Sequence, residues 1–241
     1  VSILPHMAKL LEKHQLLLNK TDILLNNTQH GFDEGRSTVS ALSFVSQNWY
    51  NATDNSKDGR SGVHALFLDF RKAFDLVDHG ILLWKLAELN VNKSFRLWIK
   101  SFLEGRSQQV KLDNIKSRSE SCPAGVPQGS VISPILFNVH INNLEDSVPS
   151  HLKISSCKYA DDCTQYEIIQ RDGYSNLQEC LDAVNDWAVS NKMQLNPKKT
   201  KDMWICFRND IEPPPLLTLG NDIIERVTSF KLLGVWHQNI I

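Results

Sequence analysis

The amino-acid sequence predicts an α+β fold in which an antiparallel sheet packs on helices. Several segments carry apolar residues at helical spacing, and short apolar runs typical of strands lie between them. Two of these runs flank Asp161 and Asp162, which indicates a hairpin with both acids at its tip rather than a βαβ repeat. The 241 residues are 41% hydrophobic and include six Trp, so the chain has enough apolar material for a core.

The first half of the chain is expected to contain a helix, a buried strand and then two more helices. Ser37 can cap the first helix, whose apolar face consists of Val39, Leu42, Val45 and Trp49. A polar loop over 51–62 precedes the run His64–Leu68, which suits a buried strand with Asp69 at its end. Gly105 closes the third helix. The apolar face of that helix consists of Phe95, Trp98, Ile99 and Phe102.

The second half is expected to supply most of the sheet. The expected strands are Gln108–Leu112, Lys153–Ala160, Cys163–Ile169 and Met203–Phe207. Ser133 and Pro134 give a cap and a first-turn proline to a helix that runs through about Leu144. A further helical stripe consists of Leu177, Cys180, Leu181, Val184, Trp187 and Ala188. The stretch 209–215, with three consecutive prolines, resembles a linker.

Composition narrows the possible partners and the cellular compartment. Lys and Arg number 26 against 27 Asp and Glu, so no bulk positive field attracts a polyanion, and nucleic-acid binding must rest on local features. The apolar runs are far shorter than the ~18 residues of a membrane span, so we expect no membrane partner. The five cysteines are odd in number and widely spaced, which indicates reduced thiols in an intracellular chain. The five cysteines lack a C-x-x-C pair, and we expect His151, Cys157 and Cys163 to be packed or exposed residues rather than zinc ligands. The abrupt ends indicate a fragment.

Three acids are the candidate catalytic groups. Asp69 closes one strand and Asp161 and Asp162 sit at a hairpin tip, so the three carboxylates can converge on one sheet edge. Adjacent carboxylates repel unless a cation compensates, and an all-oxygen ligand set favours Mg²⁺ or Mn²⁺. Two such ions ~3.5–4 Å apart support in-line phosphoryl displacement. Spacing alone also fits solvated turn residues.

Five sequence blocks occur in a fixed order along the chain. They are LFLDFRKAFDLVDH (66–79), AGVPQGSVISPILFNVHINNL (124–144), KYADDCTQY (158–166), LNPKKTK (195–201) and FKLLGVW (230–236). Together they resemble the reverse transcriptase family, most closely the reverse transcriptases of non-LTR (LINE-like) retrotransposons. The resemblance covers the chain from about Leu4 to Trp236.

The resemblance implies a right-hand polymerase palm with interleaved fingers and an absent thumb. It places fingers at 1–60 and 77–131, and palm at 61–76 and 132–241 with a primer-grip-like end. In the family, the first Asp of D-x-x-x-A-F and both Asp of Y-A-D-D hold the catalytic metals. The resemblance therefore implies that Asp69, Asp161 and Asp162 hold two Mg²⁺ ions, for which Mn²⁺ can substitute. Asp75 and Asp78 receive no metal role, and we expect them to be turn or capping residues.

The resemblance also implies nucleotide-binding roles for Phe70, Phe74, Gln128, Gly129 and Arg36. Phe74 matches the aromatic that lies under the sugar, where a packed ring leaves no room for a 2′-hydroxyl. A core aromatic is the alternative reading. In the P-Q-G loop, Gly129 lets the backbone approach a ligand, and Gln128 supplies a neutral donor and acceptor.

Three further motifs receive roles only from the resemblance. Lys199 is the candidate for the lysine that approaches the leaving pyrophosphate, with Lys198 and Lys201 as rivals and a solvated charge run as the alternative. Leu233-Gly234 resembles the turn of the strand pair that grips the primer end. The block GFDEGRST (31–38) fails the Walker A pattern, because three residues separate its glycines and Arg36 replaces Lys. The family reading instead lets Arg36 contact template or nucleotide phosphate.

The implied function is an RNA-directed DNA polymerase that adds deoxynucleotides to a DNA primer on an RNA template, with a nuclear site of action. An upstream fingers arginine that holds the triphosphate, the thumb and an endonuclease domain are expected in the remainder of the retroelement protein. Two alternatives stay open: a fragment that binds nucleic acid without catalysis, and a metal-dependent phosphodiesterase that uses the same three acids.

Overall fold

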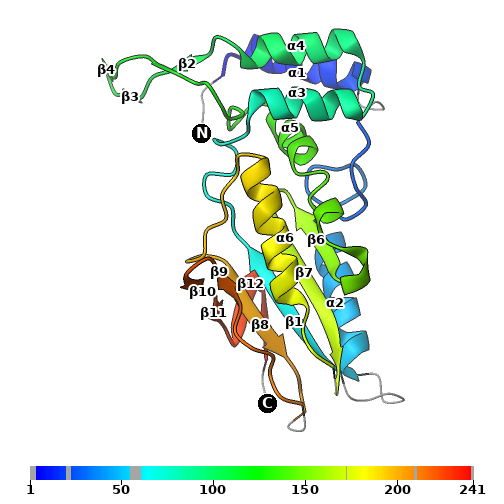
Figure 1. The fold of residues 1–241 in the computed structure, drawn as a ribbon. Coiled ribbons are helices and arrows are strands. Elements are labelled where there is room, and N and C mark those ends of the chain that lie inside the picture. Colours follow the sequence, from blue (N-terminus) through cyan, green and yellow to red (C-terminus); the bar gives the residue numbers. More distant parts are fainter. Residues whose placement is uncertain (1–3, 20–22, 55–60, 172, 209–210, 240–241) are drawn as a thin grey trace. The chain divides into compact units, whose positions relative to one another are not determined.

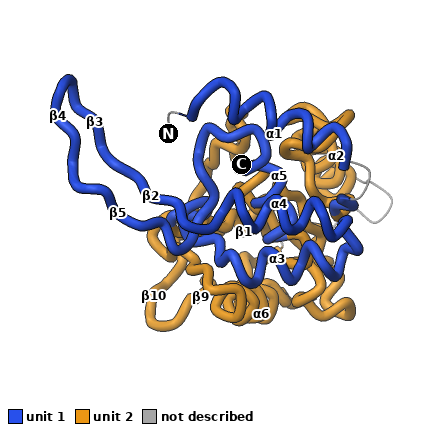
Figure 2. Tube along the Cα trace, turned by 90° about the horizontal axis from the view of Figure 1, so that it is seen from above, with its two compact units in different colours: residues 1–25, 72–141 blue, residues 26–71, 142–241 orange. Residues whose placement is uncertain are grey.

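The computed structural model describes residues 4–19, 23–54, 61–171, 173–208 and 211–239. The chain forms two compact units, and each unit is assembled from two separate stretches of sequence (Figure 2). The first unit consists of 1–25 and 72–141, and the second of 26–71 and 142–241. Each unit therefore depends on contacts between residues far apart in the chain.

The second unit is built on a five-stranded sheet (Figure 1). Its strands are β1 (Ser61–Leu68), β6 (Ser155–Tyr159), β7 (Asp162–Gln170), β8 (Lys201–Ile205) and β11 (Glu225–Arg226). The spatial order is β11-β8-β1-β7-β6, and every pairing is antiparallel except that of β11 with β8. The prediction of an antiparallel α+β core is confirmed.

Helices pack against this sheet. Its strands direct alternate side chains to opposite faces, and the helices bury the apolar side chains of those faces. Helix α2 (Thr38–Asp54) packs Ala41, Val45 and Trp49 into one core cluster. From the central strand β1, that cluster receives Val63, Ala65 and Phe67. Helix α6 (Leu177–Ser190) lies across the sheet in Figure 1 and buries the predicted stripe from Leu177 to Ala188. Short 3-10 turns, η2 (Glu145–Ser147) and η3 (Ser150–Leu152), precede β6.

A buried polar network fastens β1 to its neighbours. His64, fully buried in β1, places Nε2 2.8 Å from Asp202 Oδ1 and Nδ1 2.8 Å from Ser175 Oγ. Arg226 donates two hydrogen bonds to Asp202 Oδ2, at 2.6 and 2.9 Å. Glu167 accepts hydrogen bonds from the backbone at the start of α6. Buried charges are tolerated when they are paired and hydrogen-bonded, so this network fixes β1, β7, β8, β11 and α6 together.

Two small hairpins complete the second unit. They are β9 (Thr218–Leu219) with β10 (Asp222–Ile223), and β12 (Ser229–Leu232) with β13 (Val235–Gln238). Phe230 of β12 stacks on Phe67 of β1, with ring centroids 3.8 Å apart, and Leu232 is buried in the same cluster. The β12–β13 hairpin is therefore anchored to the sheet by its apolar residues.

The first unit is mainly helical. Its helices are α1 (His6–Asn19), α3 (His79–Glu88), α4 (Lys93–Leu103) and α5 (Ser133–His140). Asp78 caps α3 by accepting a hydrogen bond from Ile81 N, as its reading as a capping residue predicts. Between α4 and α5 the chain forms two short strand pairs. They are β2 (Ser107–Gln108) with β5 (Glu120–Ser121), and β3 (Lys111–Leu112) with β4 (Ile115–Lys116).

Several predicted boundaries are wrong. Helix α2 continues to Asp54, beyond the predicted start of the loop at Asn51, because the Asn51 side-chain oxygen accepts a hydrogen bond from Gln47 Nε2 one turn earlier in the helix. Helix α5 ends at His140 instead of Leu144. Beyond that end, the side-chain oxygen of Asn142 accepts a hydrogen bond from Asn26 N, and that of Asn143 accepts one from Trp187 Nε1. Ser133 is the first residue of α5 and Ile132 its cap. The expected strand Gln108–Leu112 is split into β2 and β3.

Two expected segments lie partly outside the described residues, namely the polar loop 51–62 and the linker 209–215. Among the described helices, none combines the length and the apolar character that crossing a bilayer demands.

Candidate active site

Asp69 directly follows β1, and the loop before β8 holds it in place. The Asp69 N–H donates to Thr200 Oγ1 at 3.2 Å, and the Asn196 N–H donates to the Asp69 carbonyl at 2.8 Å. Phe70 forms a backbone bridge with Leu195. The N-P-K-K-T stretch therefore fixes the backbone that carries the first predicted carboxylate.

Asp161 and Asp162 lie at the tip of the β6–β7 hairpin, as predicted. Ala160 and Asp161 form the two-residue turn, and Asp162 pairs with Tyr159 as the first residue of β7. Ala160 has a φ of 55°, a left-handed conformation that costs a residue with a Cβ atom about 1–2 kcal/mol. An unfavourable backbone at this position needs support from its surroundings.

Gln29 supplies that support from the segment before α2. Its Oε1 accepts hydrogen bonds from Ala160 N at 3.0 Å and from Gly31 N at 2.7 Å. Backbone hydrogen bonds join Thr28 and His30 to Lys158, so this segment runs beside the end of β6. A Cβ atom on Gly31 would lie 2.5 Å from Ala160 N, which explains the glycine. Gln29 and Gly31 form a brace for the acidic turn.

The three acids influence one another electrostatically. Burial raises the pKa of Asp161, and repulsion from Asp69 raises it further. Burial also raises the pKa of Asp162, with added repulsion from Asp161 and Asp69. Both side chains lie at an exposed tip, yet the surrounding protein displaces part of their water. In the absence of a cation, these carboxylates are held in an environment that disfavours their charged form.

The acids match a hard divalent cation in their chemistry. Asp69 Oδ1 is buried and accepts no hydrogen bond, so its lone pairs are free for a cation. An all-oxygen donor set with mutual repulsion is the kind that Mg²⁺ and Mn²⁺ neutralise. Within the described ranges, no three His, Cys, Asp or Glu side chains are already grouped closely enough to form a ready metal site.

Lys199 is the lysine of its cluster that faces an acid of the site. Its Nζ lies 3.9 Å from Asp69 Oδ2, although the Lys199 side chain is 71% exposed. Lys201, by contrast, pairs with Glu225 at 2.6 Å and bonds to the Lys198 carbonyl. An exposed pair of this length adds little stability, and the catalytic role of Lys199 stays a prediction.

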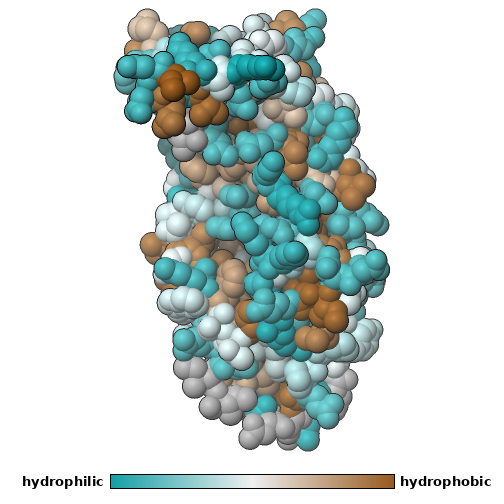
Figure 3. Space-filling view, turned by 90° about the vertical axis from the view of Figure 1, so that its left-hand side faces the viewer, coloured by the Kyte–Doolittle hydropathy of each residue, from teal (hydrophilic) through white to brown (hydrophobic). Residues whose placement is uncertain are grey.

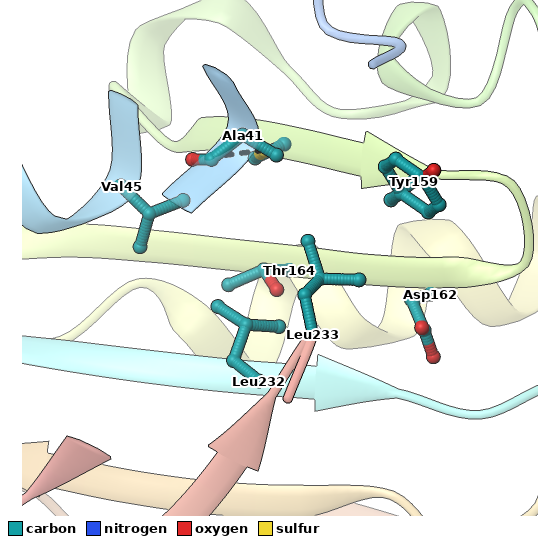
Figure 4. A pocket seen from close by; sticks show the side chains of 8 residues that line it. Ala41, Val45, Tyr159, Asp162, Thr164, Leu232 and Leu233 are labelled. Atoms are coloured by element: carbon teal, nitrogen blue, oxygen red, sulfur yellow. Dashed lines mark hydrogen bonds between the residues drawn. The ribbon is translucent and has the colours of Figure 1, made fainter. Parts of the chain in front are cut away.

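A small pocket adjoins Asp162 (Figure 4). Its lining combines α2, the β6–β7 hairpin and the β12–β13 turn, through Ala41, Val45, Cys157, Tyr159, Asp162, Thr164, Leu232 and Leu233. Leu233 and Gly234 form that turn with φ values of 46° and 92°, as the predicted turn requires. The β12–β13 turn therefore lies beside the acidic hairpin, within the same unit.

Three of the predicted nucleotide-binding residues lie in the first unit. The Val126 N–H donates to the Phe74 carbonyl at 2.9 Å, which joins Phe74 to the Pro127-Gln128-Gly129 loop. Gln128 and Gly129 are exposed, and Gly129 has a φ of 99°. The Phe74 ring stacks on Phe137 with centroids 4.5 Å apart. The first unit thus gathers Phe74 and the loop, while Asp69, Asp161, Asp162 and Lys199 belong to the second.

Two predicted nucleotide-binding residues are engaged inside the second unit. Phe70 is only 6% exposed and packs edge-on against Trp187. Arg36 forms an ion pair with Asp33 at 3.3 Å and donates to the Asn27 carbonyl. Their nucleotide-binding roles stay predictions.

Comparison with known proteins decides the family. The family model described as "Reverse transcriptase (RNA-dependent DNA polymerase)" matches residues 1–237. This chain belongs to the reverse transcriptase family. The resemblance that the five sequence blocks predicted is confirmed.

Similar reverse transcriptases come from mobile elements. The "RNA-directed DNA polymerase from mobile element jockey" of Drosophila funebris is 32% identical over 97% of this chain, and that of Drosophila melanogaster is equally similar. The "Probable RNA-directed DNA polymerase from transposon X-element" of Drosophila melanogaster is 28% identical over 98% of the chain. The chain spans 26% of the length of each of these relatives.

Solved structures show the same fold. The telomerase from Candida tropicalis, in complex with a fragment of telomeric RNA, superposes with a TM-score of 0.60 at 12% identity. The match covers 96% of this chain and 37% of the telomerase chain. The telomerase from Candida albicans gives a TM-score of 0.58. The predicted right-hand polymerase fold is confirmed.

The sequence patterns do not identify the residues that brace the site. Gln29, which holds the backbone of Ala160, belongs to no periodic or charged pattern. Thr200, which holds the backbone of Asp69, lies within the LNPKKTK block, where the lysines are the candidate functional residues. Lys158, buried beside the hairpin, pairs with Glu145 at 2.7 Å. Lysine is rarely buried without a partner, so Lys158, inside a predicted strand next to the acidic tip, was the one sequence signal of this buried ion pair.

Gln29→Ala should loosen the acidic turn. The amide groups of Ala160 and Gly31 lose their common acceptor, so we expect a loss of about 1–3 kcal/mol in the free energy of unfolding and faster hydrogen exchange at Ala160. Urea unfolding and amide exchange measure these effects. The control Gln47→Ala removes only an exposed helical pair and should change stability by less than about 0.5 kcal/mol. Unchanged exchange at Ala160 would show that Gln29 is not a brace.

Asp161→Asn combined with Asp162→Asn should stabilise the metal-free protein at neutral pH. Both acids have a folded-state pKa above the ordinary value of 3.8, so the folded protein binds more protons than the unfolded chain just above that pH. Wild-type stability should therefore fall as the pH rises through this window, and the advantage of the variant should vanish below about pH 4. Urea unfolding in EDTA at several pH values measures it.

The matched control is Asp186→Asn with Asp222→Asn, which removes two exposed charges away from the site. Its stability should follow the wild-type pH profile. Parallel profiles for wild type and the Asp161, Asp162 variant would contradict the mutual repulsion.

Proposed function

We propose that this chain forms the nucleotidyl-transfer core of an RNA-directed DNA polymerase, which extends a DNA primer on an RNA template. The observation that carries the proposal is the electrostatic coupling of Asp69, Asp161 and Asp162 at one end of a sheet, in a chain of the reverse transcriptase family. Members of this family act on a nucleic-acid template and primer and use divalent metal ions. The jockey relative is named an RNA-directed DNA polymerase, and the X-element relative a probable RNA-directed DNA polymerase.

Asp69, Asp161 and Asp162 would hold two Mg²⁺ ions, for which Mn²⁺ can substitute. Bound there, two such ions would activate the primer 3′-hydroxyl and neutralise charge on the leaving pyrophosphate. Asp69 contributes a buried oxygen that accepts no hydrogen bond, and Asp161 and Asp162 contribute carboxylates that gain stability when a cation offsets their repulsion. Lys199, 3.9 Å from Asp69, is placed to offer charge or a proton to the pyrophosphate.

The nucleotide is proposed to contact Phe74 and the Gln128-Gly129 loop, which one backbone hydrogen bond joins. Phe70 supports the backbone beside Asp69 through its bridge with Leu195. Arg36 reaches a phosphate only if it leaves Asp33. The Leu233-Gly234 turn, which lines the pocket beside Asp162 together with other residues, is proposed to grip the primer end.

The assignment of subdomains is part of the proposal. Palm is proposed for 61–76 and 132–241, and fingers for 1–60 and 77–131. Because the chain spans about a quarter of the jockey relatives, upstream fingers residues, a thumb and an endonuclease are proposed for the remainder of a retroelement protein.

Primer extension tests the proposed function. With Mg²⁺ or Mn²⁺, the wild type should add deoxynucleotides to a DNA primer on an RNA template. Asp161→Asn with Asp162→Asn should lower the rate by at least about 10²-fold, the loss expected when a preorganised electrostatic contact is removed. Asp186→Asn with Asp222→Asn should retain the wild-type rate, because these exposed acids lie outside the site.

The same samples separate the other possibilities. Mg²⁺ should raise the thermal midpoint of the wild type but not of the Asp161, Asp162 variant, because only the intact site gains stability from a bound cation. Binding of primer and template without extension would indicate a non-catalytic nucleic-acid-binding fragment. Cleavage of labelled nucleic acid in the absence of nucleotides would indicate a phosphodiesterase.

Phe74→Val should relax sugar discrimination. A smaller side chain leaves room for a 2′-hydroxyl, and a steric difference of this size corresponds to about 10–200-fold in selectivity. The measurement compares incorporation of ribonucleotides and deoxynucleotides. Phe44→Val on the exposed side of α2 is the control and should leave the ratio unchanged. An unchanged ratio in Phe74→Val would leave Phe74 as a core aromatic stacked on Phe137.

A further inference from the structure

The hairpin between α4 and α5 projects from the first unit without a core of its own. Every residue from 107 to 121 is exposed. Figures 1 and 2 show this segment extending away from the helices of its unit. Two strand pairs hold it together, β2 with β5 and β3 with β4, and each strand has only two residues. Isolated two-stranded hairpins are marginally stable in water.

The register of the β3–β4 pair separates two kinds of side chain. Lys111 lies directly opposite Lys116, and Leu112 lies opposite Ile115. Residues that face each other across an antiparallel pair share a face, so both lysines are on one side of the ribbon. Arg118 follows β4 outside the strands and adds a third exposed basic side chain to the hairpin. In Figure 3 the hairpin projects toward the viewer. Near the top of that view, brown apolar side chains lie beside teal hydrophilic ones.

The basic face is unfavourable for the hairpin by itself. Like charges directly opposite each other destabilise a strand pair, and Lys111 and Lys116 are such a pair. Across the exposed residues 107–121, three basic residues, Lys111, Lys116 and Arg118, outnumber the two acids Asp113 and Glu120, a net charge of +1 in a chain whose net charge is −1. Asp113 sits in the turn with a φ of 51°. A concentrated positive charge on an exposed arm is suited to an anionic partner.

We infer that the exposed basic side chains of this hairpin, Lys111 and Lys116 on the face they share and Arg118 beside β4, bind the phosphate backbone of nucleic acid. A run of phosphates offers regularly spaced anions to several side chains at once, and each neutralised phosphate releases counterions. The inference rests on the proposed function, because it names a contact that the template or the primer makes outside the three acids. The basic side chains offer charge but no pocket for a base. The contact would therefore position the nucleic-acid strand without recognising its base sequence.

Salt-dependent binding of a DNA primer annealed to an RNA template tests this contact. Lys111→Gln, Lys116→Gln and Arg118→Gln together should weaken binding at least tenfold near 0.1 M salt. They should also reduce the slope of log K against log salt by about two to three, one for each lost phosphate contact. The control Lys13→Gln, Lys93→Gln, Lys100→Gln removes three exposed charges from α1 and α4 and should leave both quantities at the wild-type values.

The outcomes are distinguishable from those of the proposed function. Wild-type affinity and slope in the hairpin variant, with extension intact, would overturn the contact and leave the polymerase proposal standing. A wild-type chain that binds no primer and template would overturn both. Sedimentation also tests whether the hairpin is an interface between two copies of the chain. Dimers of the wild type that dissociate in the variant Leu112→Ser with Ile115→Ser, together with unchanged nucleic-acid binding by the basic substitutions, would identify such an interface and overturn the contact.

Discussion

The partial burial of Asp161 and Asp162 beside a third carboxylate, Asp69, is the constraint around which the second unit is arranged. Burial raises the pKa of Asp161 and Asp162, and repulsion from the neighbouring acids adds to the effect. A fold that brings such groups together gives up stability in the absence of a cation. The rest of the unit has to hold them there, which accounts for the density of hydrogen bonds around the two backbone segments that carry them.

Those supports are mostly neutral. Gln29 holds Ala160, and Thr200 and Asn196 hold the Asp69 backbone, all through uncharged donors and acceptors. A cation in these positions would compete with a metal ion for the carboxylates. Lys199 is the exception, and its 3.9 Å distance and exposure leave it free to move. The charged supports, Lys158 with Glu145 and Arg226 with Asp202, are each satisfied by their own partner.

The central strand explains how these supports act together. Strand β1 pairs with β7 and β8, so the strand that delivers Asp69 is hydrogen-bonded directly to the strand that begins with Asp162. The register places Leu68 opposite Cys163, so Asp162 and Asp69 both lie at the same end of the sheet. His64 and Asp202 fix that register from inside, because a slip of one residue would move buried polar groups to the apolar face.

The fold class, the acidic hairpin, the buried strand before Asp69 and the family could be predicted from the sequence, because they depend on local periodicity and on contiguous blocks. Periodicity could not set the ends of α2 and α5, where side chains bond to residues far away or along the helix. Only the tertiary structure decided that Gln29 braces Ala160, that Lys199 faces Asp69 and that Phe70 is buried. Each of these depends on residues brought together by the fold, a placement that no local pattern encodes.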